Sequence, residues 1–345
     1  MRKVGFQMLA FLFFHNSLAG QADTTIESYC DTSYIGTFAK PVAIHVFIPS
    51  KSQNFTVTNI KSEQEVIFQP NEVTSIGIGA GYKNSMFGVS FKLKKWSNDP
   101  DIYGKTTSLD FRYNRFGRAY VWDCHWMTYQ GYYVANPGDF ISGWQNGMKY
   151  PLCNDLIYNS VSVSVLKVWN STRFSYKAIF SNTEIQKKNA GTFLHGAYIL
   201  LSSFSHPDDI IPDEINNMAD SSLHYKNMSF TNIGGWFGYA HTFIIKNKFY
   251  ISFSIIPGLG LQFAKGEHVY SSPSIQSKNL SIRGQFKMSA GFIGESYYWG
   301  IQGMTESFNY TSKSQMLLFE YGQFNLFAGK RFSLEKIKKW YSDLY

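Results

Sequence analysis

The sequence is poor in charge and has no long apolar run beyond its first residues. Charged residues make up 16% of the 345 residues, whereas an average soluble domain has about 25%. No segment after the N-terminus approaches the ~18 consecutive apolar residues that a membrane-spanning helix needs. The first deficit is unusual for a soluble domain, and the second argues against a helical membrane protein.

Cysteine is also scarce, with Cys30, Cys124 and Cys153 alone in the chain. An odd number in an exported protein leaves at least one thiol unpaired. Cys124 and Cys153 flank a long loop and could form a disulfide, although spacing alone does not test the geometry. No Cys-x-x-Cys or His pair has ligand spacing, and Gly77-x-Gly79-x-Gly81 lacks the spacing and the following helix of a dinucleotide loop. No metal and no cofactor are therefore predicted.

Aromatic residues are abundant, at 18% of the chain, and they alternate with small or polar residues. In Val73–Leu93 the apolar residues recur at every second position, and Leu280–Phe292 repeats the pattern with Arg283, Gln285 and Lys287 on the other face. A period of two places one apolar face on a β-strand. Strands of ten or more residues match the ~9–11 of a tilted membrane-spanning strand and exceed the usual soluble length of about 5–6. The pattern predicts a closed antiparallel transmembrane β-barrel of about twelve strands; a soluble all-β sandwich is the alternative.

The N-terminus resembles a cleaved export signal. Arg2 and Lys3 precede the apolar run Val4–Phe14, and small residues follow at 17–19. We expect a signal peptide at 1–20, a lead-in at 21–40, the barrel at 41–332 and a short amphipathic helix at 333–345, where apolar residues have helical spacing. The expected strands and hairpins lie at 73–94, 109–126, 160–180 (turning at 170–172), 192–204, 233–263, 280–310 and 315–332, with long loops at 131–156 and 205–228.

Several short motifs resemble a known family. The most specific is Arg173-Phe174-Ser175-Tyr176-Lys177-Ala178, followed by Glu184, Gln186-Lys187-Lys188 and Ala190-Gly191-Thr192. Pro70-Asn71-Glu72, Gly131-Tyr132-Tyr133 and Asp208-Asp209-Ile210-Ile211-Pro212 resemble other parts of it. The family is a group of exported Bacteroidetes proteins classed as a domain of unknown function, and the resemblance covers about residues 35–332. It implies an outer-membrane barrel of a Gram-negative bacterium and implies no activity.

Two groups of charged residues are candidate sites. One group could line a water-filled pore, or its charges could pair across the lumen and close it. Its inward-facing members are Asp110, Arg112, Asp123, Arg283, Lys287 and Glu306, with Gln285 among them. A second group lies at a strand end and its turn, where it could bind anions or a partner, or satisfy its own charges. Its members are Arg173, Lys177, Glu184, Lys187 and Lys188.

The expected role is the passage or binding of small polar or anionic solutes. The alternative is a non-conducting structural or assembly barrel that presents its loops to partners. A third reading, an outer-membrane lipid hydrolase, would need a base such as His125, His195, His224 or His241, but no Gly-x-Ser-x-Gly elbow occurs, and we predict no enzyme. The net charge of +8 favours contact with lipopolysaccharide phosphates or an anionic solute. Dispersed basic residues argue against nucleic acid, and insertion would involve the barrel-assembly machinery.

Overall fold

The computed structural model describes residues 30–38, 42–71, 73–82, 85–270, 275–312 and 314–333. The expected signal peptide, and all but the first residue of the expected helical tail, lie outside these residues. Within the described part of the chain no helix is long and apolar enough to cross a membrane.

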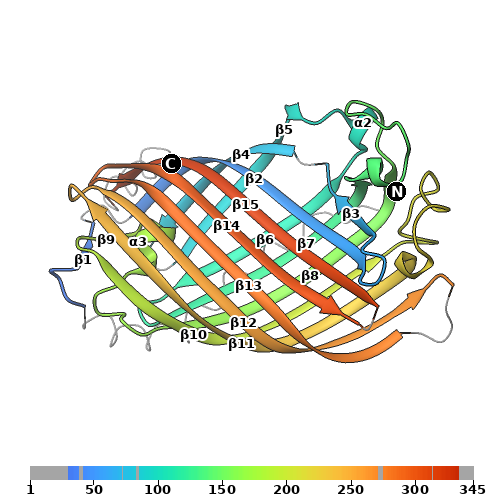
Figure 1. Ribbon diagram of the computed structural model, residues 1–345. Coiled ribbons are helices and arrows are strands. Elements are labelled where there is room, and N and C mark those ends of the chain that lie inside the picture. Colours follow the sequence, from blue (N-terminus) through green and yellow to red (C-terminus); the bar gives the residue numbers. More distant parts are fainter. Residues whose placement is uncertain are drawn as a thin grey trace, which may run out of the picture.

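The fold is an antiparallel sheet that closes on itself into a barrel (Figure 1). Closure joins the last strand to the first long strand, with Phe332 opposite Val42 and Gln315 opposite Asn59. In the described residues the sheet contains β2 (Val42–Asn59), β3 (Glu65–Gln69), β4 (Val73–Tyr82), β5 (Ser85–Ser97), β6 (Thr107–Phe116), β7 (Tyr120–Val134), β8 (Leu152–Val168), β10 (Ala190–Ser205), β11 (Tyr225–Ile245), β12 (Phe249–His268), β13 (Ile275–Ile293), β14 (Tyr297–Thr311) and β15 (Gln315–Phe332).

Four short helices and a small second sheet complete the part of the fold that the structure describes. The helices are α2 (Pro100–Tyr103), η1 (Pro137–Asp139), α3 (Tyr176–Phe180) and η2 (Ser221–Leu223). The second sheet pairs β1 (Ile35–Thr37) with β9 (Glu184–Gln186). It lies with α3 at one end of the barrel (Figure 1).

Two paths connect β2 to β7 around the ring. The shorter path runs through β3 and gives a ring of ten strands. The longer path runs through β4, β5 and β6, where β5 and β6 share the single register pair Ser85–Arg115. The expected number of about twelve wall strands depends on this longer path.

Alternation along the strands follows the two faces of the wall, as the period of two predicts. In β12 the odd-numbered residues from Ile251 to Phe263 point outward, and Leu259 is 60% exposed. The even-numbered neighbours, including Ser252, Ser254 and Gln262, are buried inside. Successive residues of a strand point to opposite faces. The exterior is therefore apolar, while polar side chains face the interior.

The two ends of the barrel differ in the length of their connections. At one end, called the turn end, three-residue turns at 117–119, 246–248 and 294–296 join β6 to β7, β11 to β12 and β13 to β14. Lys246 and Asn247 have positive φ angles of 49° and 59°, which suit a tight hairpin turn. At the opposite end, called the loop end, the connections 98–106, 135–151 and 206–224 are longer.

Two sequence-based boundaries were wrong. The loop expected at 131–156 is shorter, because β7 reaches Val134 and β8 starts at Leu152. The strand expected at 173–180 is a turn followed by α3, and β8 pairs with β10 instead. The alternation of Phe174, Tyr176, Ala178 and Phe180 fits a strand, but the Ser175 hydroxyl accepts the Ala178 N–H at 3.1 Å and starts a helix.

Candidate functional site in the barrel lumen

A network of buried charges crosses the middle of the lumen. Arg112 of β6 binds Asp123 of β7, with Nη2 and Oδ2 2.6 Å apart and Nε 3.1 Å from both carboxylate oxygens. The same Nη2 lies 3.2 Å from Glu306 Oε1 on β14. Since β6 and β14 belong to different sides of the ring, this contact joins the two walls. Charge-assisted, multidentate contacts of this kind are strong when they are enclosed.

The β13 residues complete the network from the other wall. Arg283 Nη2 lies 3.3 Å from Glu306 Oε2, and its guanidinium stacks 5.0 Å from the Trp236 ring. Gln285 Nε2 donates to Glu306 Oε1, and Lys287 Nζ lies 3.7 Å from Asp123 Oδ2. The expected inward charges Asp123, Arg283 and Lys287 are therefore brought into one network. Lys287 pairs with Asp123, and Arg283 pairs with Glu306.

Asp110 forms the adjoining part of the network with residues that the sequence analysis did not connect to it. Its Oδ1 lies 3.1 Å from Lys51 Nζ on β2 and 3.1 Å from His125 Nε2 on β7. Its Oδ2 accepts the Tyr321 hydroxyl at 3.1 Å. Lys51 was missed because residues 49–54 of β2 show no apolar alternation, so the sequence gives no sign of which residues there face inward.

Apolar side chains fill the lumen toward the loop end. Phe55 stacks on Phe68 with ring centroids 4.6 Å apart, and Phe308 stacks on Phe319 at 4.6 Å. The loop 206–224 contributes buried Ile210 to this cluster. Further buried members from five strands are Met127, Tyr132, Leu156, Tyr158, Leu200, Phe204, Phe230 and Leu317.

Residues 169–189, called the plug segment, occupy the lumen at the turn end. Glu184 binds Arg118, with Oε1 2.6 Å from Nη2, and Lys177 Nζ lies 3.4 Å from the same oxygen. The Ser175 hydroxyl donates to the other Glu184 oxygen. All four side chains are buried. Of the predicted second group, Lys177 and Glu184 thus neutralise each other inside the barrel.

The plug segment is also fixed to the walls. The backbone oxygen of Ile179 accepts Gln302 Nε2 at 3.1 Å, and the Tyr176 hydroxyl donates to Ser254 at 3.2 Å. Arg331 Nη2 donates to the Asn182 oxygen at 2.9 Å. Strands β12, β14 and β15 therefore all hold this segment in place.

Arg173, Lys187 and Lys188, the other members of the second group, are exposed outside this core. The Arg173 guanidinium and the Lys188 ammonium each lie 5.1 Å from the Tyr34 ring centroid. Lys187 Nζ donates to the Thr32 oxygen at 2.9 Å. Arg173 also faces Asp31, whose pKa is lowered mainly by the hydrogen bond from the Ser33 hydroxyl and further by nearby cations. These exposed cations form a basic surface at the turn end.

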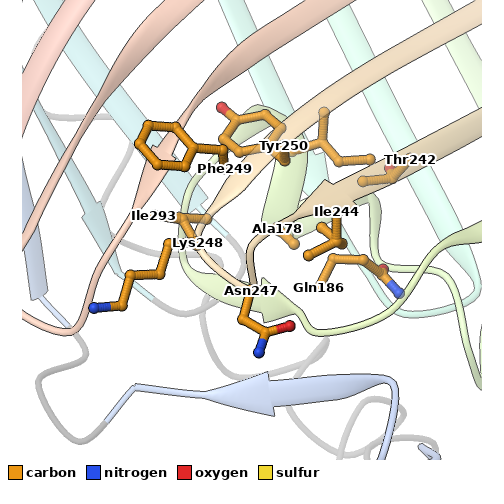
Figure 2. Close-up of a pocket in the computed structure, with 10 residues that line it drawn as sticks. Ala178, Gln186, Thr242, Ile244, Asn247, Lys248, Phe249, Tyr250 and Ile293 are labelled. Atoms are coloured by element: carbon orange, nitrogen blue, oxygen red, sulfur yellow. The ribbon is translucent and has the colours of Figure 1, made fainter.

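Two small cavities lie within the described part of the barrel. A cavity of about 20 Å³ lies beside Arg283, His125, Ser160 and Tyr321, enough for about one water molecule. A second cavity of about 10 Å³ lies at the turn end (Figure 2). Figure 2 shows Ala178 of the plug segment beside Ile244 and Tyr250 of the wall, so this cavity is the seam between plug and wall.

The four histidines considered for hydrolysis lie in separate places. His125 faces Asp110 in the lumen, and His224 Nδ1 lies 2.5 Å from Asp209 Oδ2 at the loop end. His195 accepts the Trp169 indole N–H, and His241 lies 3.0 Å from the Tyr239 hydroxyl, both near the turn end. Among the described residues, no group of three His, Cys, Asp or Glu side chains is arranged to hold a metal ion.

The possible disulfide between Cys124 and Cys153 is not formed, since both are free thiols. Cys124 points outward opposite Val163, whereas buried Cys153 lies opposite Tyr132, eight residues farther along β7. Eight residues of strand span about 26 Å, far beyond the usual Cα separation in a disulfide. The two residues flank the loop in sequence, but β7 and β8 extend into it and carry them apart.

Comparisons with known proteins concern the barrel as a whole. The outer-membrane protease OmpT from Escherichia coli matches with 7% identity and a TM-score of 0.39, over 84% of this chain and 96% of that chain. The translocator domain of the autotransporter NalP from Neisseria meningitidis matches with 10% identity and a TM-score of 0.26, over 91% and 94%. The Pseudomonas putida toluene transporter TodX matches with 6% identity and a TM-score of 0.23, over 85% and 90%.

The family assignment comes from the sequence. No curated protein sequence matches the chain. A family model described as Domain of unknown function (DUF4421) matches residues 29–332, which is most of the chain. The expected membership in a family of unknown function is thereby confirmed, and the chain belongs to the DUF4421 family.

Proposed function

We propose that this protein is an outer-membrane β-barrel with a closed, non-conducting lumen, which serves as a rigid scaffold that presents its loops to partners. The observation that carries the proposal is the Arg112–Glu306 contact, which joins opposite walls at 3.2 Å. Apolar packing lies on one side of it and the plug segment on the other, and the cavity beside Arg283 measures about 20 Å³. On this proposal a solute larger than water does not pass through the lumen.

The membrane assignment rests on the outer surface. Large apolar side chains point away from the barrel on neighbouring long strands, with Leu280 68% exposed and Ile282 63% exposed. A soluble protein rarely exposes a continuous apolar surface of this kind. Closure of the sheet pairs the backbone groups that hydrocarbon cannot satisfy. Short turns face the periplasm and long loops face outward in such barrels, and the proposal therefore assigns the turn end to the periplasm.

The rest of the proposal follows from this placement. Residues 1–20 direct export, the barrel-assembly machinery inserts the chain, and β4, β5 and β6 join the wall to give about twelve strands. The loops at 98–106, 135–151 and 206–224 meet partners outside the cell. The proposal includes no enzymatic activity, and lipid-release assays on His224→Ala would test that part.

A second candidate is the binding or slow passage of a small anion. Leaving His125 aside, the network contains four cations (Lys51, Arg112, Arg283, Lys287) and three carboxylates (Asp110, Asp123, Glu306). Among the described residues, Arg112 Nη1 and Arg283 Nη1 are buried without hydrogen-bond partners. Buried donors of this kind carry a cost unless something satisfies them, which favours an anionic or water ligand.

Conductance in planar bilayers separates the two candidates. The closed scaffold predicts no steady single-channel current from protein whose insertion is verified by the heat-dependent mobility of a folded barrel. Steady current would overturn it. Inorganic phosphate binding by calorimetry, lost in Arg283→Gln and retained in Lys265→Gln, would instead support the second candidate, because Lys265 is an exposed cation away from the lumen.

A further inference from the structure

A row of exposed lysines follows the turn-end margin of the wall from β8 to β15, at the end that holds α3 in Figure 1. Lys167 lies near the end of β8 and Lys330 near the end of β15, both on the outer face. Lys246 and Lys248 lie in the turn between β11 and β12. All four are exposed, and we call them the rim lysines. Among the described residues outside the plug segment, Glu295 is the one exposed acid of this margin.

The loop-end half of the same strands has no such excess of cations. Its exposed lysines and acids are equal in number among the described residues, namely Lys226, Lys265 and Lys278 against Asp155, Glu267 and Glu320. The loop 206–224 adds the exposed acids Asp208, Asp213 and Glu214. The positive excess on the outer wall from β8 to β15 therefore belongs to the turn end.

A row of aromatic side chains crosses the outer face next to this margin. Phe249 of β12 pairs with Phe292 of β13, and Phe292 pairs with Trp299 of β14. Their ring centroids are 5.4 Å and 6.0 Å apart, and Trp299 is 51% exposed. Barrels carry such rows where the wall meets the membrane–water interface. In the proposed membrane placement, this row therefore marks the level of the lipid headgroups.

Two of the rim lysines lie directly beside exposed aromatic rings. Lys330 pairs with Tyr297 in the strand register, and its Nζ lies 5.2 Å from the Tyr297 ring centroid. Lys167 Nζ lies 6.0 Å from the Trp169 ring centroid, and Trp169 is 64% exposed. A lysine stem can lie along apolar surface while its ammonium group stays in the polar layer. These lysines therefore present their charge at the headgroup level.

The rim lysines have no anionic partner of their own. Within the described part of the chain, none of the four ammonium groups forms an ion pair. A lysine ammonium is a compact point charge that binds phosphate well. An anion that reaches this margin therefore finds the cations available.

We propose that the turn-end margin binds anionic phospholipids of the periplasmic leaflet. The headgroup phosphates contact the rim lysines, and the acyl chains lie on the apolar wall, where Leu326 follows Lys330 on the same face. A soluble acidic protein is less favoured, because Lys167 and Lys330 project from the side of the wall. This inference rests on the membrane placement in the proposed function, and it adds a lipid partner to the scaffold.

Native mass spectrometry of the mature chain tests the preference. The barrel is released from nanodiscs that contain equal amounts of phosphatidylglycerol and phosphatidylethanolamine, and the bound lipids are counted. We expect phosphatidylglycerol in excess. Because one lysine near a membrane surface strengthens the attraction of anionic lipid about fivefold, the ratio of the two lipids should fall at least about tenfold when all four rim lysines become glutamine.

Two matched variants separate charge from structure. Arginine at all four positions keeps the charge and should keep the lipid ratio. Glutamine at Lys226, Lys265 and Lys278 removes exposed cations from the loop end, and it should also leave the ratio unchanged. Heat-dependent mobility verifies that every variant is folded. Added salt should lower the ratio in the parent protein, because exposed charges are screened.

Photo-cross-linking in the outer membrane of a Gram-negative host supplies an independent arm. Benzoylphenylalanine replaces Tyr297, an exposed aromatic residue beside Lys330, and mass spectrometry identifies the adducts. We expect an adduct with an anionic phospholipid. An adduct with protein alone, equal binding of the two lipids by the parent, or a ratio unchanged by the four glutamines would overturn the proposal. Recovery of the protein without detergent, or steady current, would instead overturn the proposed function, whatever the lipid ratio.

Discussion

Arg112 of β6 and Glu306 of β14 meet across the lumen, 194 residues apart in the chain, with Nη2 and Oε1 separated by 3.2 Å. Glu306 also accepts from Arg283 and Gln285, so one carboxylate holds together side chains from two walls. A buried carboxylate with several donors fixes the distance between the strands that carry them. The barrel is therefore braced internally as well as closed by its backbone.

Loss of this carboxylate should strongly destabilise the barrel. Glu306→Gln leaves Arg112 and Arg283 buried without their shared counter-charge, and breaking a buried ion pair costs about 3–5 kcal/mol. Denaturant unfolding in lipid vesicles measures the free energy of unfolding of each variant. Glu320→Gln, at an exposed position on β15, should change it by less than about 0.5 kcal/mol. Equal stabilities for the two variants would show that the brace contributes nothing.

Loosening of the plug segment should follow from Glu184→Gln. Arg118 and Lys177 would both lose their buried partner, so local opening of residues 169–189 becomes easier. Trypsin added at the turn end of reconstituted barrels should cleave after exposed Arg173 about tenfold faster. Lys188→Gln, in the same segment but exposed, serves as the control. Unchanged cleavage in Glu184→Gln would indicate that packing alone holds the segment.

The apolar belt predicts a penalty for charge on the outer face. Leu259 points outward from the middle of β12, and arginine at the membrane midplane costs about 2–4 kcal/mol. Leu259→Arg should lower the folded fraction in vesicles, whereas Lys265→Arg near the loop end should not. A water-soluble particle would respond in the opposite way, since an exposed arginine would improve its solubility.

The loop 206–224 should lose stability in acid through Asp220. Its carboxylate accepts the Ser222 N–H at 2.9 Å, and this backbone hydrogen bond is the main cause of its lowered pKa. The pKa of Asp220 in the folded state lies below the unfolded value of about 3.9. The stabilisation from its carboxylate is therefore fully present above pH 3.9, and it is lost as the pH falls through the lowered pKa. Asp220→Ala should cost about 1 kcal/mol at neutral pH.

Hydrogen exchange of residues 221–223 measures this effect. The difference in protection between the parent protein and Asp220→Ala should be constant at neutral pH and vanish below the lowered pKa. Asp220→Asn retains a capping oxygen but has no titrating group. In this variant the hydrogen-exchange protection of residues 221–223 should therefore not fall in acid. A difference that persisted at low pH would assign the effect to packing.

The alternation of apolar and polar residues in the sequence predicted most wall strands, because each of these strands has one apolar face on the outside of the barrel. It failed in the middle of β2, where Pro49, Ser50 and Lys51 interrupt the pattern, and in the plug segment, where packing around Tyr176 inside the lumen favours a capped helix. Sequence also suggested that Asp123 and Arg283 face inward. It could not say whether they pair, because contacts across the lumen depend on the diameter and stagger of the closed barrel.

The pairing of β1 with β9 bears on the order of biogenesis. Ile35 pairs with Gln186, which is synthesised about 150 residues later. The β1–β9 pair therefore cannot form until β9 is available. β2 in turn waits for β15. Strand-by-strand addition therefore cannot complete either contact until late in assembly. An insertion factor that shelters the free margin of β2 until the last strand arrives would meet this requirement.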